Sequence, residues 1–159
     1  MYDIEAMFYQ VKVPVRQRDL LRFLWWENGD TSKHPQVYRM TVHLFGAASS
    51  PGCSNFALKT TADDNEAAIG SAGAEFLRRN FYVDDGLKSV ASIEEAVELV
   101  KDIKEMCKRG GFNLHMFTSN RKEVIEQIPV SDRAEGIKHL DFSRDALPME
   151  HTLGVQWCI

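Results

Sequence analysis

The chain has 159 residues, of which 44% are hydrophobic and 26% are charged. This length and balance fit one soluble globular domain with a buried core. The net charge of −4 argues against a free-standing basic nucleic-acid binder. Three widely spaced cysteines, Cys53, Cys107 and Cys158, predict no disulfide framework or zinc site and favour a reducing compartment. No apolar run reaches membrane-spanning length, and no signal-peptide pattern is seen.

The first part of the chain is predicted to be rich in strands. It begins abruptly as a strand with Asp3 at its end, which we interpret as a piece of something longer. A lone aspartate there could equally cap the short helix that we expect next. Three segments follow: a core strand within residues 17–26, a polar hairpin loop over 27–36, and an alternating, half-buried strand over 37–44. Because nothing is expected to pack above residues 15–45, we also predict exposed apolar surface around residues 20–26, which would be an aggregation liability.

A loop of small residues leads from this strand into a helix. Within residues 45–58, Ser49 or Ser50 is the expected N-cap, and Pro51 falls in the first turn. Small residues let a flat ligand, such as a nucleotide, lie close to the backbone. An ordinary strand-to-helix connection explains the same pattern. A further helix is predicted over residues 64–79, where two glycines weaken it.

Residues 81–90 are the stretch around which the chain is organised. Apolar residues precede Asp84 and Asp85, Gly86 follows, and a second β-prone run closes the segment. Asp-Gly between two such runs predicts a β-hairpin with both carboxylates at its tip. Adjacent carboxylates disfavour each other's ionisation, and a divalent cation in front of them would remove that penalty. On this pattern alone, a solvated acidic turn without function is the commoner interpretation.

The rest of the chain is predicted to be scaffold. Ser92 and Glu95 form a capping box for an amphipathic helix that stops at Gly110. Asn120 is expected to cap a short helix. Three other segments complete the prediction: a strand over residues 112–118, a polar irregular segment over 130–150 and a final strand over 151–159.

Four motifs occur in order along the chain: Asp3-Ile4-Glu5-Ala6-Met7-Phe8, Gly46-Ala47-Ala48-Ser49-Ser50-Pro51, Tyr82-Val83-Asp84-Asp85 and Leu153-Gly154-Val155-Gln156-Trp157. With Gly110-Gly111-Phe112-Asn113-Leu114, they resemble the palm of reverse transcriptases of the BEL/Pao class of long-terminal-repeat retrotransposons. The resemblance covers nearly the whole chain. It implies an α+β fold, a ferredoxin-like antiparallel sheet backed by helices, with a partial fingers segment. Residues 1–159 would be a single partial domain that lacks the N-terminal fingers and the C-terminal thumb.

The resemblance implies an RNA-directed DNA polymerase that uses two Mg²⁺ ions, which Mn²⁺ could replace, to join deoxynucleotides to a primer 3′-hydroxyl. Asp3 and Asp84 would bind both ions, and the backbone carbonyl of Ile4 would be an extra ligand. Asp85 would be an auxiliary acid that shapes the local field. The implied partners are an RNA or DNA template with its primer, deoxynucleoside triphosphates and the remaining fingers, thumb and RNase H of a polyprotein. The implied location is the cytoplasm, or virus-like particles within it, without a membrane.

The resemblance also implies substrate contacts. Phe8 would be the steric gate that rejects a 2′-hydroxyl, and Tyr82 would touch the primer end. By pattern alone, both are ordinary core or strand aromatics. The pocket for the incoming nucleotide and template would be lined by Phe45, Gly46, Ser50 and Pro51. The strand that grips the primer would contribute Leu153, Gly154, Gln156 and Trp157.

One departure from the family pattern concerns the strand after Gly110. The family usually has a lysine there that may protonate pyrophosphate, whereas this chain has Met116, with His115 as a conceivable substitute. A truncated, catalytically silent retrotransposon remnant is therefore an alternative. A non-catalytic domain whose acids bind metal or cap turns is a third hypothesis, and the presence of acids at all three family positions argues against it.

Overall fold

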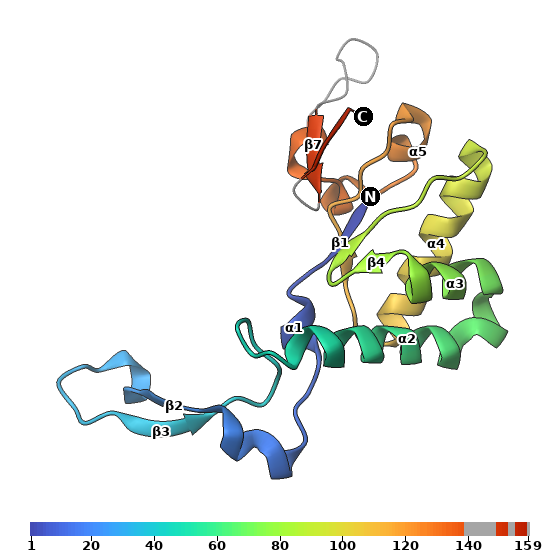
Figure 1. The fold of residues 1–159 in the computed structure, drawn as a ribbon. Helices are drawn as coiled ribbons and strands as arrows, with labels where there is room; N and C mark the ends of the chain where they lie inside the picture. The colour runs from blue at the N-terminus through green and yellow to red at the C-terminus, as the bar shows by residue number, and fades with distance from the viewer. Residues whose placement is uncertain (139–148, 153–154, 159) are drawn as a thin grey trace. The chain divides into compact units, whose positions relative to one another are not determined.

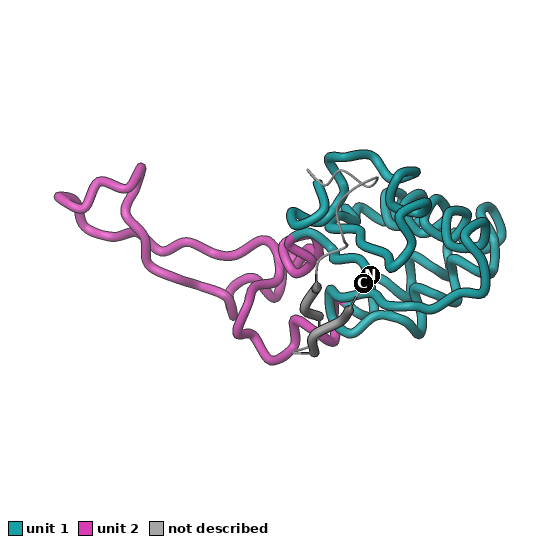
Figure 2. Tube along the Cα trace, turned by 90° about the horizontal axis from the view of Figure 1, so that it is seen from above, with its two compact units in different colours: residues 1–5, 55–159 teal, residues 6–54 magenta. Residues whose placement is uncertain are grey.

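The structure is a computed structural model that describes residues 1–138 and the backbone of residues 149–152 and 155–158. It combines helices with small antiparallel sheets, so the predicted α+β class is confirmed at this level (Figure 1). The chain divides into two compact units, one of residues 1–5 and 55–159 and the other of residues 6–54 (Figure 2). Among the residues described, no helix is both long and apolar enough to cross a membrane.

The larger unit is built on a four-stranded antiparallel sheet. Its strands are β1 (Tyr2–Ile4), β4 (Phe81–Tyr82), β5 (Asp85–Gly86) and β6 (Leu114–His115), in the order β4-β5-β1-β6. In β1, Asp3 lies opposite Asp85 on one side and His115 on the other. The predicted strand over 112–118 forms only at its centre, because Met116 adopts a left-handed backbone with φ 52°.

The central hairpin forms as predicted, but its turn lies elsewhere. Tyr82 pairs with Asp85, so the turn residues are Val83 and Asp84 and the predicted Asp-Gly turn is wrong. Gly86 is a strand residue, and glycine is required there because the packed rings leave no room for a Cβ. A Cβ there would lie 2.8 Å from Cζ of Phe81. Val83 instead takes the left-handed conformation, with φ 57°, which is unfavourable for a β-branched side chain.

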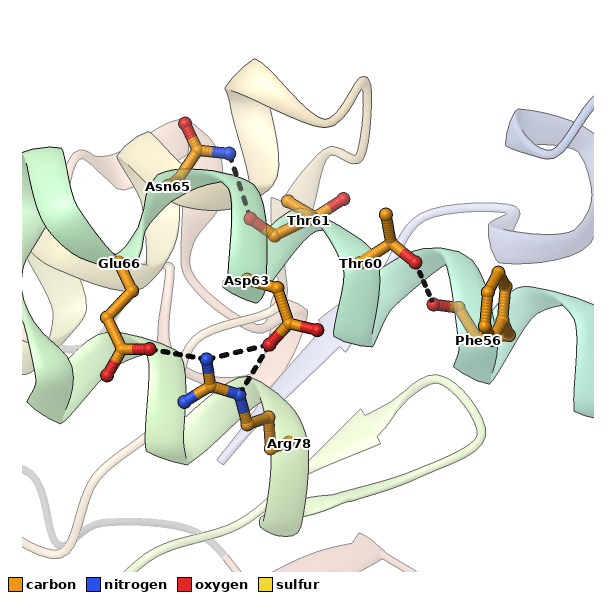
Figure 3. Close-up of polar contacts among 7 residues, drawn as sticks. All are labelled: Phe56, Thr60, Thr61, Asp63, Asn65, Glu66 and Arg78. Atoms are coloured by element: carbon orange, nitrogen blue, oxygen red, sulfur yellow. Dashed lines mark hydrogen bonds and ion pairs between the residues drawn. The ribbon is translucent and has the colours of Figure 1, made fainter.

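The two helices predicted before the hairpin both form, but the boundary between them lies elsewhere. Helix α2 (Ser50–Ile69) has Pro51 in its first turn as expected and continues past residue 64, and α3 (Ser71–Arg79) follows. Gly70 separates them with φ 141° and ψ 157°, angles that are essentially open to glycine alone. The guanidinium of Arg78 then bonds back to α2, at 2.8 Å from Asp63 Oδ1 and 2.5 Å from Glu66 Oε2 (Figure 3).

Helix α4 (Ile93–Arg109) confirms the capping prediction. The backbone N–H of Glu95 donates to Ser92 Oγ at 3.1 Å, and the Glu95 carboxylate accepts from the N–H of Ala91 at 3.1 Å. Its apolar face is buried at Leu99, Val100, Ile103, Met106 and Cys107. The fully buried core of this unit also includes Ile4, Phe76, Leu77 and Phe117.

The C-terminal part departs from the predictions in three ways. Helix α5 (Lys122–Glu126) begins after Arg121, without a side-chain cap, so the predicted Asn120 cap is wrong. The segment after it contains two 3₁₀ turns, Val130–Asp132 and Glu135–Ile137, and buries Ile137 with Ile125 and Ala134. The predicted single final strand is two antiparallel strands, β7 (Met149–Thr152) and β8 (Val155–Cys158), which satisfy each other's backbone hydrogen bonds.

The smaller unit contains α1 (Met7–Gln10), a 3₁₀ helix (Val15–Leu21), β2 (Arg22–Trp25), a 3₁₀ turn (Glu27–Gly29) and β3 (Gln36–Arg39). The predicted hairpin is confirmed, because β2 and β3 pair antiparallel. The predicted core strand over 17–26 and half-buried strand over 37–44 are wrong in burial. All residues of both strands are exposed, since a two-stranded ribbon has no second layer of its own.

Candidate active site

Three carboxylates that are far apart in the sequence come together at one end of the central sheet. Asp3 and Asp85 are direct partners on β1 and β5. Asp84 precedes Asp85 in the hairpin turn, and its carbonyl accepts a hydrogen bond from the N–H of Ile4 at 3.0 Å. Asp3 does not cap α1, whose N-cap residue is Ala6 with no side-chain hydrogen bond. The register therefore places Asp3 beside the hairpin acids.

Burial and neighbouring negative charge raise the proton affinity of the two hairpin acids. Partial burial is the main cause that raises the pKa of Asp84, and the charge of Asp3 adds to it while a backbone hydrogen bond opposes it. Burial also leads for Asp85, whose pKa is raised further by Asp84 and then by Asp3. These shifts mark an electronegative cluster in which the negative charges of Asp84 and Asp85 are less favourable than in water. A bound cation would relieve that penalty.

The third strand partner adds a base to the cluster. His115 lies opposite Asp3 on β6, and its Nε2 is 2.7 Å from Asp3 Oδ1. Both side chains are about 30% exposed, so the pair is open to solvent. The imidazole therefore engages one carboxylate oxygen of Asp3 and fixes the direction of the carboxylate.

The donor chemistry fits a hard divalent cation, but the cluster is not a closed cage. In the part of the chain that the structure describes, no group of three or more His, Cys, Asp or Glu is arranged to hold a metal ion. Mg²⁺ commonly needs only one or two protein carboxylates, with water and substrate phosphates completing its shell. Asp84, Asp85 and the second oxygen of Asp3 are oxygen donors of that kind. The site therefore fits an ion that arrives with a phosphate ligand.

The hairpin presents its aromatic residue outward. Tyr82 pairs with Asp85 across the turn, and 69% of its surface is exposed. The left-handed Val83 is the link between this tyrosine and the acids. Backbone strain of this kind gathers at sites whose geometry is held by the surrounding structure. Tyr82 is thus free to contact a ligand that approaches the acids.

The predicted nucleotide-pocket residues lie in or next to the smaller unit's loop. Phe8 is buried and packs edge-to-face against the exposed Phe45, with ring centroids 4.8 Å apart. Gly46 has φ 83°, and an added Cβ there would meet no atom within 4 Å. Pro51 is exposed in the first turn of α2. This region therefore combines a packed aromatic pair, Phe8 and Phe45, with open space beside the backbone of Gly46.

Ser50 has a structural role in that loop. Its hydroxyl is fully buried and donates to the carbonyl of Leu44 at 2.8 Å. It also lies 3.4 Å from Nδ1 of His43. The hydroxyl therefore ties the start of α2 to the segment before the loop, and its atoms are withdrawn from solvent.

The predicted primer-grip residues lie at the end of the chain. Leu153 and Gly154 are outside the described residues. Gln156 and Trp157 belong to β8, where their backbones pair with His151 and Glu150. Strand pairing alone does not test contact with a primer, so the predicted primer grip stays a prediction.

Comparisons with protein-family models, curated proteins and solved structures found no match to this chain. The geometry of the acidic cluster is therefore the main support for a function. Sequence reasoning noted His115 only as a substitute for a lysine, and it missed the contact with Asp3. The two residues are 112 positions apart, and only the strand register brings them together.

Proposed function

We propose that this chain is the palm of an RNA-directed DNA polymerase similar to the BEL/Pao reverse transcriptases, with residues 6–54 as a partial fingers segment. One observation carries the proposal: Asp3 on β1 lies beside Asp84 and Asp85 of the neighbouring β4–β5 hairpin in one antiparallel sheet. Burial and mutual repulsion raise the pKa of both hairpin acids, as expected where a cation is to be bound. The order of the sequence motifs agrees with this geometry.

Asp3 and Asp84, with the carbonyl of Ile4, would hold two Mg²⁺ or Mn²⁺ ions. When bound, the ions supply Lewis-acid chemistry, which lowers the pKa of a primer 3′-hydroxyl and neutralises the leaving pyrophosphate. Asp85 faces Asp3 across the sheet and adds negative charge to the site. His115 fixes the direction of the Asp3 carboxylate through its 2.7 Å contact.

The proposed substrate contacts are supported by which aromatic side chains are buried and which are exposed. Phe8, held in place by Phe45, would give the incoming sugar a rigid wall that rejects a 2′-hydroxyl. The exposed Tyr82 would contact the primer end. Nucleotide and template would lie against Phe45, Gly46 and Pro51, while Ser50 shapes the loop from within. The remaining partners would be the primer-grip strand and the rest of a polyprotein.

A catalytically silent remnant is the second candidate, and two observations favour it. His115 already engages one oxygen of Asp3, which leaves only the second oxygen for a metal ion. Met116, at the position where the family pattern has lysine, cannot donate a proton and stands in a left-handed backbone. Under this alternative, the chain keeps the acidic cluster without turnover.

Primer extension on an RNA template tests the proposal. We expect Mg²⁺-dependent extension by the chain joined to the fingers and thumb that the resemblance implies, and loss of it in Asp84→Asn. Asp64→Asn is the matched control, because Asp64 is exposed on α2 and belongs to no part of the cluster. Metal binding is measured in parallel as the rise in melting temperature with Mn²⁺. A rise in melting temperature that depends on Asp84, without any extension, would favour the silent remnant. Absence of both the rise and the extension would refute both candidate functions.

A further inference from the structure

The loop that joins β2 to β3 contains Asn28-Gly29, the single Asn-Gly pair of the chain. Glycine has no side chain to shield its backbone nitrogen, so that nitrogen can approach the amide of the preceding asparagine closely. Every other asparagine of the chain is followed by Phe, Glu, Leu or Arg, whose side chains hinder such an approach. Asn28 and Gly29 are both exposed, so water reaches the atoms that would react.

The folded loop holds this pair in a conformation that opposes the reaction. Asn28 has φ 54° and ψ 21°, and Gly29 has φ 74°, as in the left-handed turns that Asn-Gly favours. A five-membered ring would need the Gly29 nitrogen nearly eclipsed with the Asn28 Cβ about the Cα–C bond, and this ψ keeps the two atoms apart. The N–H of Gly29 also donates to the carbonyl of Trp26 at 3.0 Å. The attacking nitrogen is therefore both misdirected and engaged while the turn is closed.

Contacts within the β2–β3 ribbon keep the turn closed. The N–H of Asp30 donates to the carbonyl of Glu27 at 3.1 Å, and the Asp30 carboxylate accepts from the Ser32 hydroxyl at 2.6 Å. Further along the ribbon, Phe23 and Tyr38 are cross-strand partners whose rings stack with centroids 5.8 Å apart. Both strands are exposed throughout, and a ribbon without a second layer opens at a small cost in free energy. The turn is therefore closed most of the time and open at intervals.

We propose that Asn28 is a deamidation site and that opening of the turn over residues 27–30 sets its rate. In the open turn, the backbone nitrogen of Gly29 attacks Cγ of Asn28. The N–Cγ bond forms as the Cγ–Nδ2 bond breaks, and the backbone proton leaves with Nδ2 as ammonia. One water molecule then opens the resulting succinimide ring at either carbonyl, which gives aspartate or isoaspartate. The sequence of steps needs only water, and it does not depend on the acidic cluster or on polymerase activity.

Either product would loosen the ribbon. A carboxylate at position 28 would lie between Glu27 and Asp30, so three acidic side chains would repel one another in one short turn. Isoaspartate also inserts an additional methylene into the backbone, which changes the length of chain between the carbonyl of Glu27 and the N–H of Asp30. The hydrogen bond that closes the turn would then be lost. Deamidation would therefore favour the open loop from which it started.

Peptide mass spectrometry tests the proposal, because it reads the mass gain from amide to acid at each asparagine. The whole chain is incubated in mildly alkaline buffer with and without urea. We expect Asn28 to react about tenfold faster in urea, where the two backbone hydrogen bonds of the turn are broken. Asn120 is the internal control, since it is exposed but followed by Arg121, and it should react slowly in both buffers. In urea, where folding has no influence, Gly29→Ala should slow the reaction at Asn28.

Variants of the folded chain test the role of the ribbon. Phe23→Ala/Tyr38→Ala removes the stacked rings and should raise the native rate at Asn28 by about threefold or more. Phe56→Ala is the matched control, because Phe56 is an exposed aromatic residue on α2, outside this unit. Equal native and urea rates, a double variant no faster than Phe56→Ala, or an Asn28 as slow as Asn120 in urea would each overturn the proposal.

Discussion

Replacing Gly86 by alanine should destabilise the hairpin that carries the acids. The added Cβ would lie 2.8 Å from Cζ and 2.9 Å from Cε1 of Phe81, and 3.3 Å from Cζ of the fully buried Phe76. Gly86 is buried in β5 and Phe76 is fully buried, so the half-buried Phe81 ring would have to shift and give up its edge-to-face contact with Phe76. Overpacking of this kind costs about 1–3 kcal/mol in the free energy of unfolding. For a chain of this size, that corresponds to a fall in melting temperature of about 2–12 °C.

Thermal denaturation followed by circular dichroism at 222 nm measures the effect. Gly52→Ala is the control, because its added Cβ meets no atom within 4 Å and alanine favours the helix by roughly 0.5–1 kcal/mol. If the contact with Phe81 is the cause, Phe81→Leu should at least halve the cost of Gly86→Ala in a double-mutant cycle. A Gly86→Ala variant as stable as the wild type, or a cost unaffected by Phe81→Leu, would refute the reasoning.

Three other predictions concern the turn, the acids and the thiols. Val83→Asn should raise the free energy of unfolding by about 1 kcal/mol, because asparagine tolerates the left-handed backbone, and urea denaturation that shows a loss would contradict this. The folded-state pKa of Asp84 lies above its ordinary value of 3.8, so the folded state binds the extra proton and stability falls as the pH rises through that window. Asp84→Asn should therefore be more stable than the wild type at pH 7, and its advantage should shrink below pH 3.8; an advantage that is constant with pH would count against it. Burial raises the pKa of Cys107 to about 12, so iodoacetamide should label the exposed Cys53 in the native chain and Cys107 only after unfolding, as read by mass spectrometry.

Local signals in the sequence predicted the elements whose causes are local. The helix after Ser92 was predictable because its cap, its apolar spacing and its terminal glycines lie within one short segment. The β2–β3 hairpin was also predictable from its polar loop. Its apolar run at residues 20–26 predicted both a core strand and an exposed surface, because such a run looks the same whether or not a second layer covers it, and the structure shows the exposed one.

The acidic cluster was predictable as a set of residues, and its geometry was not. The motifs indicated Asp3, Asp84 and Asp85, but the neighbour order β5-β1-β6 is a long-range property. The turn lies elsewhere because Asp-Gly commonly signals positive φ, whereas Gly86 is required here by the rings packed over it. The bond of His115 to Asp3 could not be predicted without that register.

The corner at Gly70 has a consequence for how this sequence can vary. Because its backbone angles are closed to other residues, selection for the folded chain should keep glycine there while exposed neighbours on both helices drift. Arg78 should change only together with Asp63 and Glu66, which it joins across the corner. In related sequences that are no longer under selection for folding, loss of Gly70 should be as frequent as any other substitution. This single position would therefore distinguish lineages in which the protein is still maintained from those in which it is decaying.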